Sequence, residues 1–303
     1  MNILVTGATG FLGRYLVPRL QKAGHTVLVA HSKNADLTEK ASLPRLCGNK
    51  KFDRIYHLAV WTKAGDFCLY HQGEQWIINQ QIHTNMLWYW RAHQPQALMI
   101  AMGTSCSYPF GERALKEEDY LKGEADPNLF TYAMTKRMLY TGLLAFEKQF
   151  GMRFQHLIPS TLYGPGFEAG DNHFIFDLIK KIHTGKTHGE EVVLWGTGEQ
   201  VRELMFVDDA VRLIERAAEL PTNENLNLGS GKGYSIREWA EILCEIIGYD
   251  AQKIRYDTTK YSGNPKRFFD TTKVRKFFPD FAYTDIREGL QKTVAYYKSI
   301  VYQ

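Results

Sequence analysis

The feature that most constrains the fold is a glycine-rich turn between a short apolar strand and a helix at the start of the chain. Residues 2–6 have the pattern of a buried strand, the turn follows at 7–13 (GATGFLG), and an amphipathic helix is expected over Leu12–Ala23. Glycines at this spacing let the backbone approach a pyrophosphate closely, and the N–H groups at the helix start then face its oxygens. The sequence therefore predicts a dinucleotide site.

The rest of the chain predicts an α/β fold: a Rossmann-type doubly wound parallel sheet with a smaller C-terminal α/β substrate lobe. Short apolar runs alternate with amphipathic stretches in the first half, which is the rhythm of βαβ units. Turn residues cluster at Gly164-Pro165-Gly166, so we place the lobe boundary there. Residues 1–165 are expected to form the dinucleotide domain, to which segments near 203–232 return, and residues 166–303 mainly form the substrate lobe.

The expected elements can be given by residue range. Strands are predicted at 2–6, 26–30, 54–58, 97–102, 154–159 and 192–195. Helices are predicted at 12–23, 74–93, 132–150, 174–184, 208–219 and 236–247, with one more at the end of the chain.

Composition and charge argue against several other classes of protein. The net charge is +4 without a run of like charges or a basic-aromatic stripe, so nucleic-acid binding is not expected. No segment has the roughly 20 apolar residues that span a bilayer. The four cysteines are scattered without a Cys-x-x-Cys pair, which indicates reduced thiols and no metal site. The start lacks the features of a signal peptide, so we expect a cytoplasmic protein.

The end of the second strand favours NADP over NAD. NAD-binding proteins usually place an acidic residue there, on the ribose 2′-hydroxyl. This chain has Val29-Ala30-His31-Ser32-Lys33 instead, and a hydroxyl with a cation suits a 2′-phosphate. Asp36, a few residues later, keeps NAD as the alternative.

Two patterns indicate carbonyl chemistry. Tyr132 and Lys136 are four residues apart on a predicted helix, so the phenol and the ammonium group share one face. The lysine is expected to lower the pKa of the tyrosine from about 10 toward neutrality, which would make the phenol a usable proton donor or acceptor. Thr104 and Ser105 follow the strand that ends near Met102, at the sheet edge where ligands bind. A hydroxyl there can hold a substrate oxygen beside the tyrosine.

On these motifs the chain resembles the extended short-chain dehydrogenase/reductases, the NAD-dependent epimerase/dehydratase group, and among them the GDP-L-fucose synthases. The matching segments cover nearly the whole chain: 6–13 (TGATGFLG), 57–59 (HLA), Asn85, 104–109 (TSCSYP), 132–136 (YAMTK), 159–165 (PSTLYGP), 195–198 (WGTG), 202–209 (RELMFVDD) and 227–231 (NLGSG). Most of these segments are shared by epimerases, dehydratases and reductases of sugar nucleotides.

The resemblance implies roles for individual positions. The cofactor-binding residues would be Gly7, Thr9, Gly10, Phe11, Leu12, Gly13, His31, Ser32, Lys33, Asp36, Leu37, Leu58, Ala59, Tyr132, Lys136, Pro159, Thr161 and Leu162. The substrate-binding residues would be Asn172, Lys181, Trp195, Arg202, Lys266 and Arg267, and the catalytic ones Thr104, Ser105, Cys106, Tyr132, Lys136 and His173.

Cys106 and His173 are the narrower part of the resemblance. In the fucose synthases, a cysteine two residues after the catalytic hydroxyl acts as the epimerisation base, and a histidine at the start of a later helix acts as the acid. A 4-keto group acidifies the hydrogens on C3 and C5, so a thiolate can remove one while an imidazolium returns a proton to the other face. The alternatives are that Cys106 is a small core residue and that His173 is a polar residue at a helix start.

The chain also departs from the family at several substrate positions. Thr161 stands where the family has asparagine, and Lys181 stands where it has an arginine that holds the diphosphate. The segment 262–267 (SGNPKR) lacks a carboxylate found in the family's version. These departures weaken the implied GDP contacts but leave the implied reductase chemistry intact.

The resemblance implies NADPH-dependent reduction of the C4 ketone of a nucleotide-activated 4-keto-6-deoxysugar, GDP-linked, with or without epimerisation at C3 and C5. The alternative enzyme is an NAD-dependent 4-epimerase of a UDP-, dTDP- or CDP-sugar, and the remote alternative is a cofactor-sensing regulator without catalysis. Related enzymes pair two long helices from each subunit. Because the helices at 74–93 and 132–150 carry exposed-looking aromatic residues, including Trp76, Trp88 and Trp90, we expect a homodimer.

Overall fold

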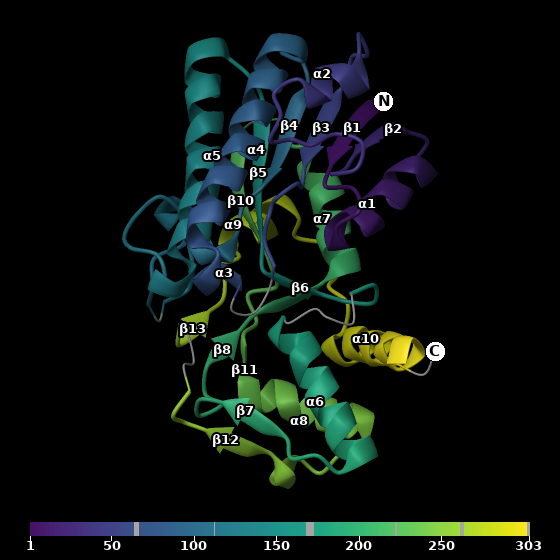
Figure 1. Ribbon diagram of the computed structural model, residues 1–303, viewed down its shortest axis with the longest axis vertical. Coiled ribbons are helices and arrows are strands. Elements are labelled where there is room, and N and C mark those ends of the chain that lie inside the picture. Colours follow the sequence, from purple (N-terminus) through teal and green to yellow (C-terminus); the bar gives the residue numbers. More distant parts are fainter. Residues whose placement is uncertain (64–66, 112, 168–172, 222, 261–263, 302–303) are drawn as a thin grey trace.

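A parallel sheet forms the centre of the molecule, as the sequence predicts, and it has six strands. The computed structural model describes residues 1–63, 67–111, 113–167, 173–221, 223–260 and 264–301. The strand order is β10-β5-β4-β3-β1-β2, and every neighbouring pair is parallel (Figure 1). The strands are β1 (Asn2–Thr6), β2 (Thr26–Ala30), β3 (Arg54–His57), β4 (Leu98–Met102), β5 (Phe154–Pro159) and β10 (Glu224–Leu228). The last of these comes from the second half of the chain and completes the sheet beside β5.

Helices cover both faces of this sheet because successive strand side chains point to opposite sides. In β1, Ile3 and Val5 are fully buried in one core and Leu4 in the other. The first core is covered by α1 (Phe11–Lys22), α7 (Val207–Ala217) and α9 (Thr272–Phe277). The second is covered by α2 (Ser42–Cys47), α4 (Gln72–His93) and α5 (Phe130–Phe150), and α4 and α5 lie side by side in Figure 1.

A smaller lobe with its own apolar core lies beyond the carboxyl edge of the sheet (Figure 1). Its helices are α6 (Phe174–His188), α8 (Ile236–Ile247) and α10 (Ile286–Val301). Its strands form small sheets: β7 (Val193–Trp195) with β12 (Arg255–Asp257), and β8 (Val201–Arg202) between β11 (Tyr234–Ser235) and β13 (Lys266–Arg267). The chain passes between the two parts through the paired strands β6 (Thr161–Tyr163) and β9 (Leu204–Phe206).

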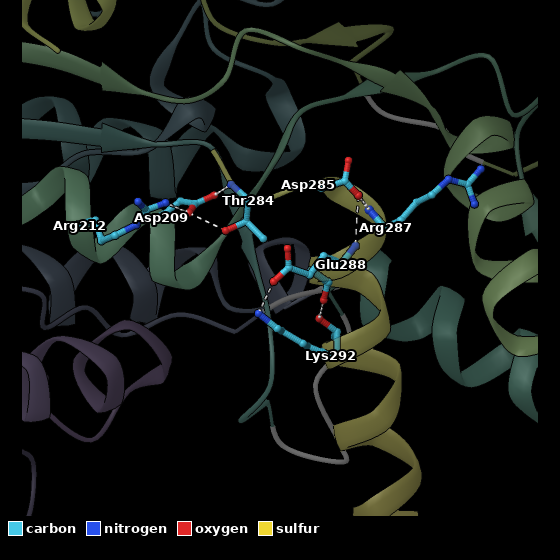
Figure 2. A network of polar contacts seen from close by, with 9 residues as sticks. Asp209, Arg212, Thr284, Asp285, Arg287, Glu288 and Lys292 are labelled. Carbon is cyan, nitrogen blue, oxygen red and sulfur yellow. Dashed lines mark hydrogen bonds and ion pairs between the residues drawn. The ribbon is translucent and has the colours of Figure 1, made fainter. Parts of the chain in front are cut away.

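A buried carboxylate connects α7 of the sheet domain to the segment that leads into α10. Asp209 accepts hydrogen bonds from the backbone N–H and the hydroxyl of Thr284, both at 2.8 Å, and it also pairs with Arg212 (Figure 2). The next residue, Asp285, accepts from the backbone N–H of Arg287 at 2.9 Å. This contact satisfies an N–H group at the start of α10, where the helix has no internal acceptor for it. The last helix is thereby fixed to the sheet domain.

The aromatic residues of α4 differ from the sequence prediction. Trp76 is exposed, but Trp88 is half-buried under the Lys40 ammonium group, which lies 4.1 Å from the ring centroid. Trp90 is fully buried, and its indole N–H donates to the carbonyl of Ala97 at 2.9 Å. The prediction that all three are exposed is therefore wrong for Trp90, because α4 buries that side against β4 rather than presenting it outward.

The part of the chain that the structure describes contains neither a membrane-spanning helix nor a metal-binding cluster. None of the helices there is long and apolar enough to cross a membrane. Among the same residues, no group of three or more His, Cys, Asp or Glu side chains is arranged to hold a metal ion.

Candidate active site

The glycine loop after β1 forms a cradle that has no room for side chains. Gly7 has φ +69°, and a Cβ atom added there would lie 2.7 Å from the backbone nitrogen of Ala59. A Cβ on Gly13 would lie 2.5 Å from the carbonyl oxygen of Gly7. Gly10 precedes α1 and gives it no side-chain cap, so the first N–H groups of the helix are left to a ligand. This arrangement fits a dinucleotide pyrophosphate.

The turn after β2 presents no carboxylate at the strand end. The His31 backbone N–H donates to the Asn34 side chain at 2.8 Å, and this turn leaves Ser32 and Lys33 exposed. Asp36 lies further along and is engaged locally, because it accepts from the backbone and hydroxyl of Thr38 at 2.9 and 2.7 Å. The geometry agrees with preference for a 2′-phosphate.

The other predicted cofactor positions lie at the carboxyl edge of the sheet or beside it. Leu58 and Ala59 follow β3, and Pro159 ends β5. Thr161 and Leu162 lie in β6, and Leu37 is held by a hydrogen bond of 2.9 Å from the Asn85 amide to its carbonyl.

Tyr132, Thr104 and Lys136 come together where β4 ends. Tyr132 and Lys136 lie in the first turns of α5, and Thr104 follows β4. The Thr104 side chain lies beside the Tyr132 phenol and interacts with it. Lys136 is 2% exposed, and its Nζ donates to the carbonyl of Met102 at 2.8 Å. The three residues can therefore hold a carbonyl oxygen and deliver a proton to it.

Burial dominates the titration of this group, contrary to the sequence expectation. Burial raises the pKa of Tyr132, and the neighbouring Cys106 raises it further. Burial also lowers the pKa of Lys136 to about 7. Lys136 therefore does not bring the pKa of the phenol to neutrality in the unliganded protein, because burial has the largest effect on the pKa of both groups. Tyr132 stays protonated through the neutral range, which suits a proton donor.

Cys106 lies beside these groups and contacts a cation from the other lobe. Its sulfur is 3.5 Å from Nη1 of Arg267, and Nη2 of the same arginine is 3.6 Å from Asp126. Arg267 is thus held between a thiol and a carboxylate.

A small cavity joins the two lobes next to this cluster. Its lining includes Ser105 and Thr161 from the sheet domain and Arg202 and Arg267 from the lobe. Ser160 lines the same cavity, and its buried hydroxyl makes no hydrogen bond among the described residues. Sequence reasoning had not assigned Ser160 a role, because the position carries no signal apart from its adjacency to Thr161. Two guanidinium groups and three hydroxyls line this cavity together with the Glu203 carboxylate, and guanidinium groups suit phosphate oxygens.

The remaining predicted substrate residues are more dispersed. Lys181 pairs with Asp177 at 2.8 Å on α6, Trp195 is 58% exposed on β7, and Lys266 is exposed on β13. His173 immediately precedes α6, and Asn172 lies outside the described residues. Lys181, Trp195 and Lys266 do not line the small cavity that contains Arg202.

The start of α6 nevertheless lies close to the glycine loop. Phe11, the first residue of α1, makes an edge-to-face contact with Phe176 in the first turn of α6, with 6.1 Å between the ring centroids. His173 in turn contacts Phe176 with its own ring at 6.1 Å. These contacts connect the histidine, through Phe176, to the first residue of α1.

Comparison with known proteins places this site in a family. A model of the NAD dependent epimerase/dehydratase family matches residues 3–229. GDP-L-fucose synthase 1 from Arabidopsis thaliana is 31% identical, over 98% of this chain and 93% of its own length. GDP-L-colitose synthase from Yersinia pseudotuberculosis is 28% identical, over 98% of each chain. Among solved structures, a GDP-L-fucose synthetase from Naegleria fowleri superimposes with a TM-score of 0.87 at 22% identity, covering 100% of this chain and 94% of that one.

Proposed function

Because this chain belongs to the NAD dependent epimerase/dehydratase family, we propose that it reduces the C4 ketone of a GDP-linked 4-keto-6-deoxysugar with NADPH and epimerises the sugar at C3 and C5. The observation that carries this proposal is that two groups of side chains occur together at this edge of the sheet. The first group consists of Thr104, Tyr132 and the buried Lys136, and the second consists of the Cys106 thiol and the Arg267 guanidinium group. The first group performs reduction, and the second adds a base for epimerisation.

The two parts of the molecule divide this work. Residues 1–165, with the returning segments near 203–232, hold the dinucleotide, and the 166–303 lobe supplies most of the nucleotide-sugar contacts. The glycine cradle and the exposed Ser32 and Lys33 favour NADP(H) as the cofactor, which supplies a hydride to C4. In this proposal Arg202 and Arg267, which line one cavity with Ser105 and Thr161, hold the diphosphate.

The proposal is tested by incubating the protein with NADPH and a panel of 4-keto sugar nucleotides that carry GDP, dTDP, UDP or CDP. We expect NADPH oxidation with a GDP-linked 4-keto-6-deoxyhexose, and product analysis should then show changed configuration at C3 and C5. Tightly retained NAD, together with interconversion of C4 epimers and no net oxidation of NADPH, would contradict the reductase and support a 4-epimerase.

We further propose that the protein is a homodimer formed through α4 and α5. Exposed apolar side chains remain on both helices: Trp76 and Ile77 on α4, and Phe130, Met138 and Phe150 on α5. Exposed apolar residues gathered on adjacent helices are typical of a contact surface. A two-fold axis would pair the same surface on both subunits.

Light scattering after size exclusion at micromolar concentration should give twice the monomer mass for the wild type. Ile77→Glu places a charge on α4 at a side chain that is 58% exposed, and it should shift the protein to monomer. Leu121→Glu is the matched control, because Leu121 is 42% exposed but lies outside both helices. A wild type that is monomeric, or equal dissociation by both variants, would refute this interface.

A further inference from the structure

Three buried side chains, Thr6, His57 and His83, form a chain of hydrogen bonds near Lys136. The Thr6 hydroxyl is 2.9 Å from Nδ1 of His57, and Nε2 of His57 is 2.9 Å from Nδ1 of His83. These residues come from β1, β3 and α4 and are 0%, 1% and 2% exposed. Burial in this environment lowers the pKa of His57 to about 3 and also lowers the pKa of His83, so both imidazoles are neutral at physiological pH.

The outer end of this chain is unsatisfied. Nε2 of His83 is buried and makes no hydrogen bond with any residue that the structure describes. A buried polar atom without a partner costs free energy, so such atoms usually meet a ligand, a water molecule or a charge. After burial itself, the Lys136 ammonium group has the largest effect on the pKa of His83, ahead of the hydrogen-bonded His57. The geometry agrees, because Lys136 donates to the carbonyl of Met102 at 2.8 Å, and the preceding residue, Ala101, pairs with His57 in the sheet.

The proton positions along the chain follow from this charge. Each neutral imidazole has one N–H and one lone pair, so the chain can run in two directions. If the Thr6 hydroxyl donates to His57, then His57 donates to His83 and an N–H of His83 points out, toward a cation. If His83 donates to His57 and His57 to Thr6, a lone pair of His83 points out instead. Only the second direction turns a nitrogen lone pair, which carries partial negative charge, toward the Lys136 ammonium group.

We propose that His83 is a positioning residue for the reduction: one buried water molecule accepts a hydrogen bond from the Lys136 ammonium group and donates one to the Nε2 lone pair of His83. His57 and Thr6 hold the ring in the tautomer that offers this lone pair. The proposal rests on the proposed function, since Lys136 acts there by orienting and charging the site around Tyr132. The hydrogen bond keeps Lys136 charged in a site where burial opposes the charge.

Two substitutions of His83 test the roles of its two ring nitrogens separately. His83→Asn retains an amide where Nδ1 contacts His57 but has no atom at the place of Nε2. His83→Gln extends its amide to the place of Nε2 and gives up the contact with His57. A merely structural role predicts similar losses for both variants, because both replace the buried ring with a smaller amide.

We expect His83→Asn to lower kcat for ketone reduction about tenfold at pH 7.5 and His83→Gln to retain at least about half of it, in line with the effect of one hydrogen bond to a charged group. The pH profile gives a second readout. The groups that face Lys136 are His57 from β3, His83 from α4, His156 from β5 and Tyr132 on its own helix. Losing an acceptor disfavours the lysine cation, so its pKa falls and the alkaline loss of kcat should begin at lower pH in His83→Asn. Equal kcat values, or unshifted profiles, would overturn the proposal.

A measurement without substrate separates this proposal from the proposed function. Nitrogen-15 NMR of histidine-labelled protein, assigned with the His83→Gln variant, reports which ring nitrogen is protonated. We expect Nδ1 of His83 to carry the hydrogen and Nε2 to be a lone pair. A hydrogen on Nε2 would refute the contact with Lys136 even in an enzyme that reduces the ketone. If no 4-keto sugar nucleotide is reduced by the wild type, the proposed function fails, and the spectrum still decides the tautomer.

Discussion

Replacing Tyr132 by phenylalanine is expected to lower the rate of ketone reduction by at least about 100-fold, which is the usual contribution of a positioned general acid. The phenol lies beside Thr104 and, by burial, remains protonated at neutral pH. It is therefore the group with a proton to give to O4 as the carbonyl is reduced. Phenylalanine keeps the ring and its packing but has no proton and no hydrogen bond to the oxygen. The measurement is kcat from NADPH absorbance at saturating substrate.

Tyr140→Phe is the matched control for this variant. Tyr140 lies two turns further along the same helix, where its ring stacks on His156 with 4.4 Å between centroids. Losing that hydroxyl should leave kcat within about twofold of the wild type, because the group does not meet the substrate. If Tyr132→Phe keeps more than about a tenth of wild-type kcat while binding NADPH normally, another group donates the proton. The assignment of Tyr132 would then be wrong.

Local sequence patterns predicted most of the fold because each pattern has a local physical cause. The glycine at position 7 is required by its φ of +69° and by the 2.7 Å approach of Ala59, and such a requirement is visible in the sequence as a glycine. The strands and long helices follow the alternation of apolar residues, which burial on one or two faces imposes. For the same reason Tyr132 and Lys136 could be placed on one face of a helix before the structure was known.

Contacts between distant segments could not be predicted in this way. The distance of 3.5 Å between Arg267 and Cys106 joins residues on different lobes, and the His57–His83 pair joins a strand to a helix. Nothing in the periodicity of either segment encodes its partner. The expectation for the pKa of Tyr132 failed for a related reason. It considered the charge of Lys136 but not the burial of both groups, which only the packed structure shows.

Replacing Cys106 by serine is expected to separate the two reactions. In heavy water without NADPH, the wild type should introduce deuterium at C3 and C5 of the 4-keto sugar, because the thiolate removes those hydrogens and solvent deuterons replace them. Cys106→Ser should lower the rate of this uptake at least about 100-fold, since a serine hydroxyl ionises far less readily than a thiol. Serine should keep the contact with Arg267, because it is small, polar and able to accept the same hydrogen bond. The variant therefore changes the base without removing this contact.

The same variant provides its own control. A substrate that already has the product configuration at C3 and C5 needs no base, so Cys106→Ser should reduce it with kcat within about threefold of the wild type, because the oxyanion-holding groups Thr104 and Tyr132 are unchanged. His173→Gln should likewise suppress deuterium uptake, at the carbon where the acid returns its proton, and should release partly epimerised sugar. Suppose instead that the wild type reduces the ketone with no deuterium at either carbon. The protein would then be a reductase alone, and the thiol that Arg267 contacts would serve to shape the sugar pocket rather than to remove a proton.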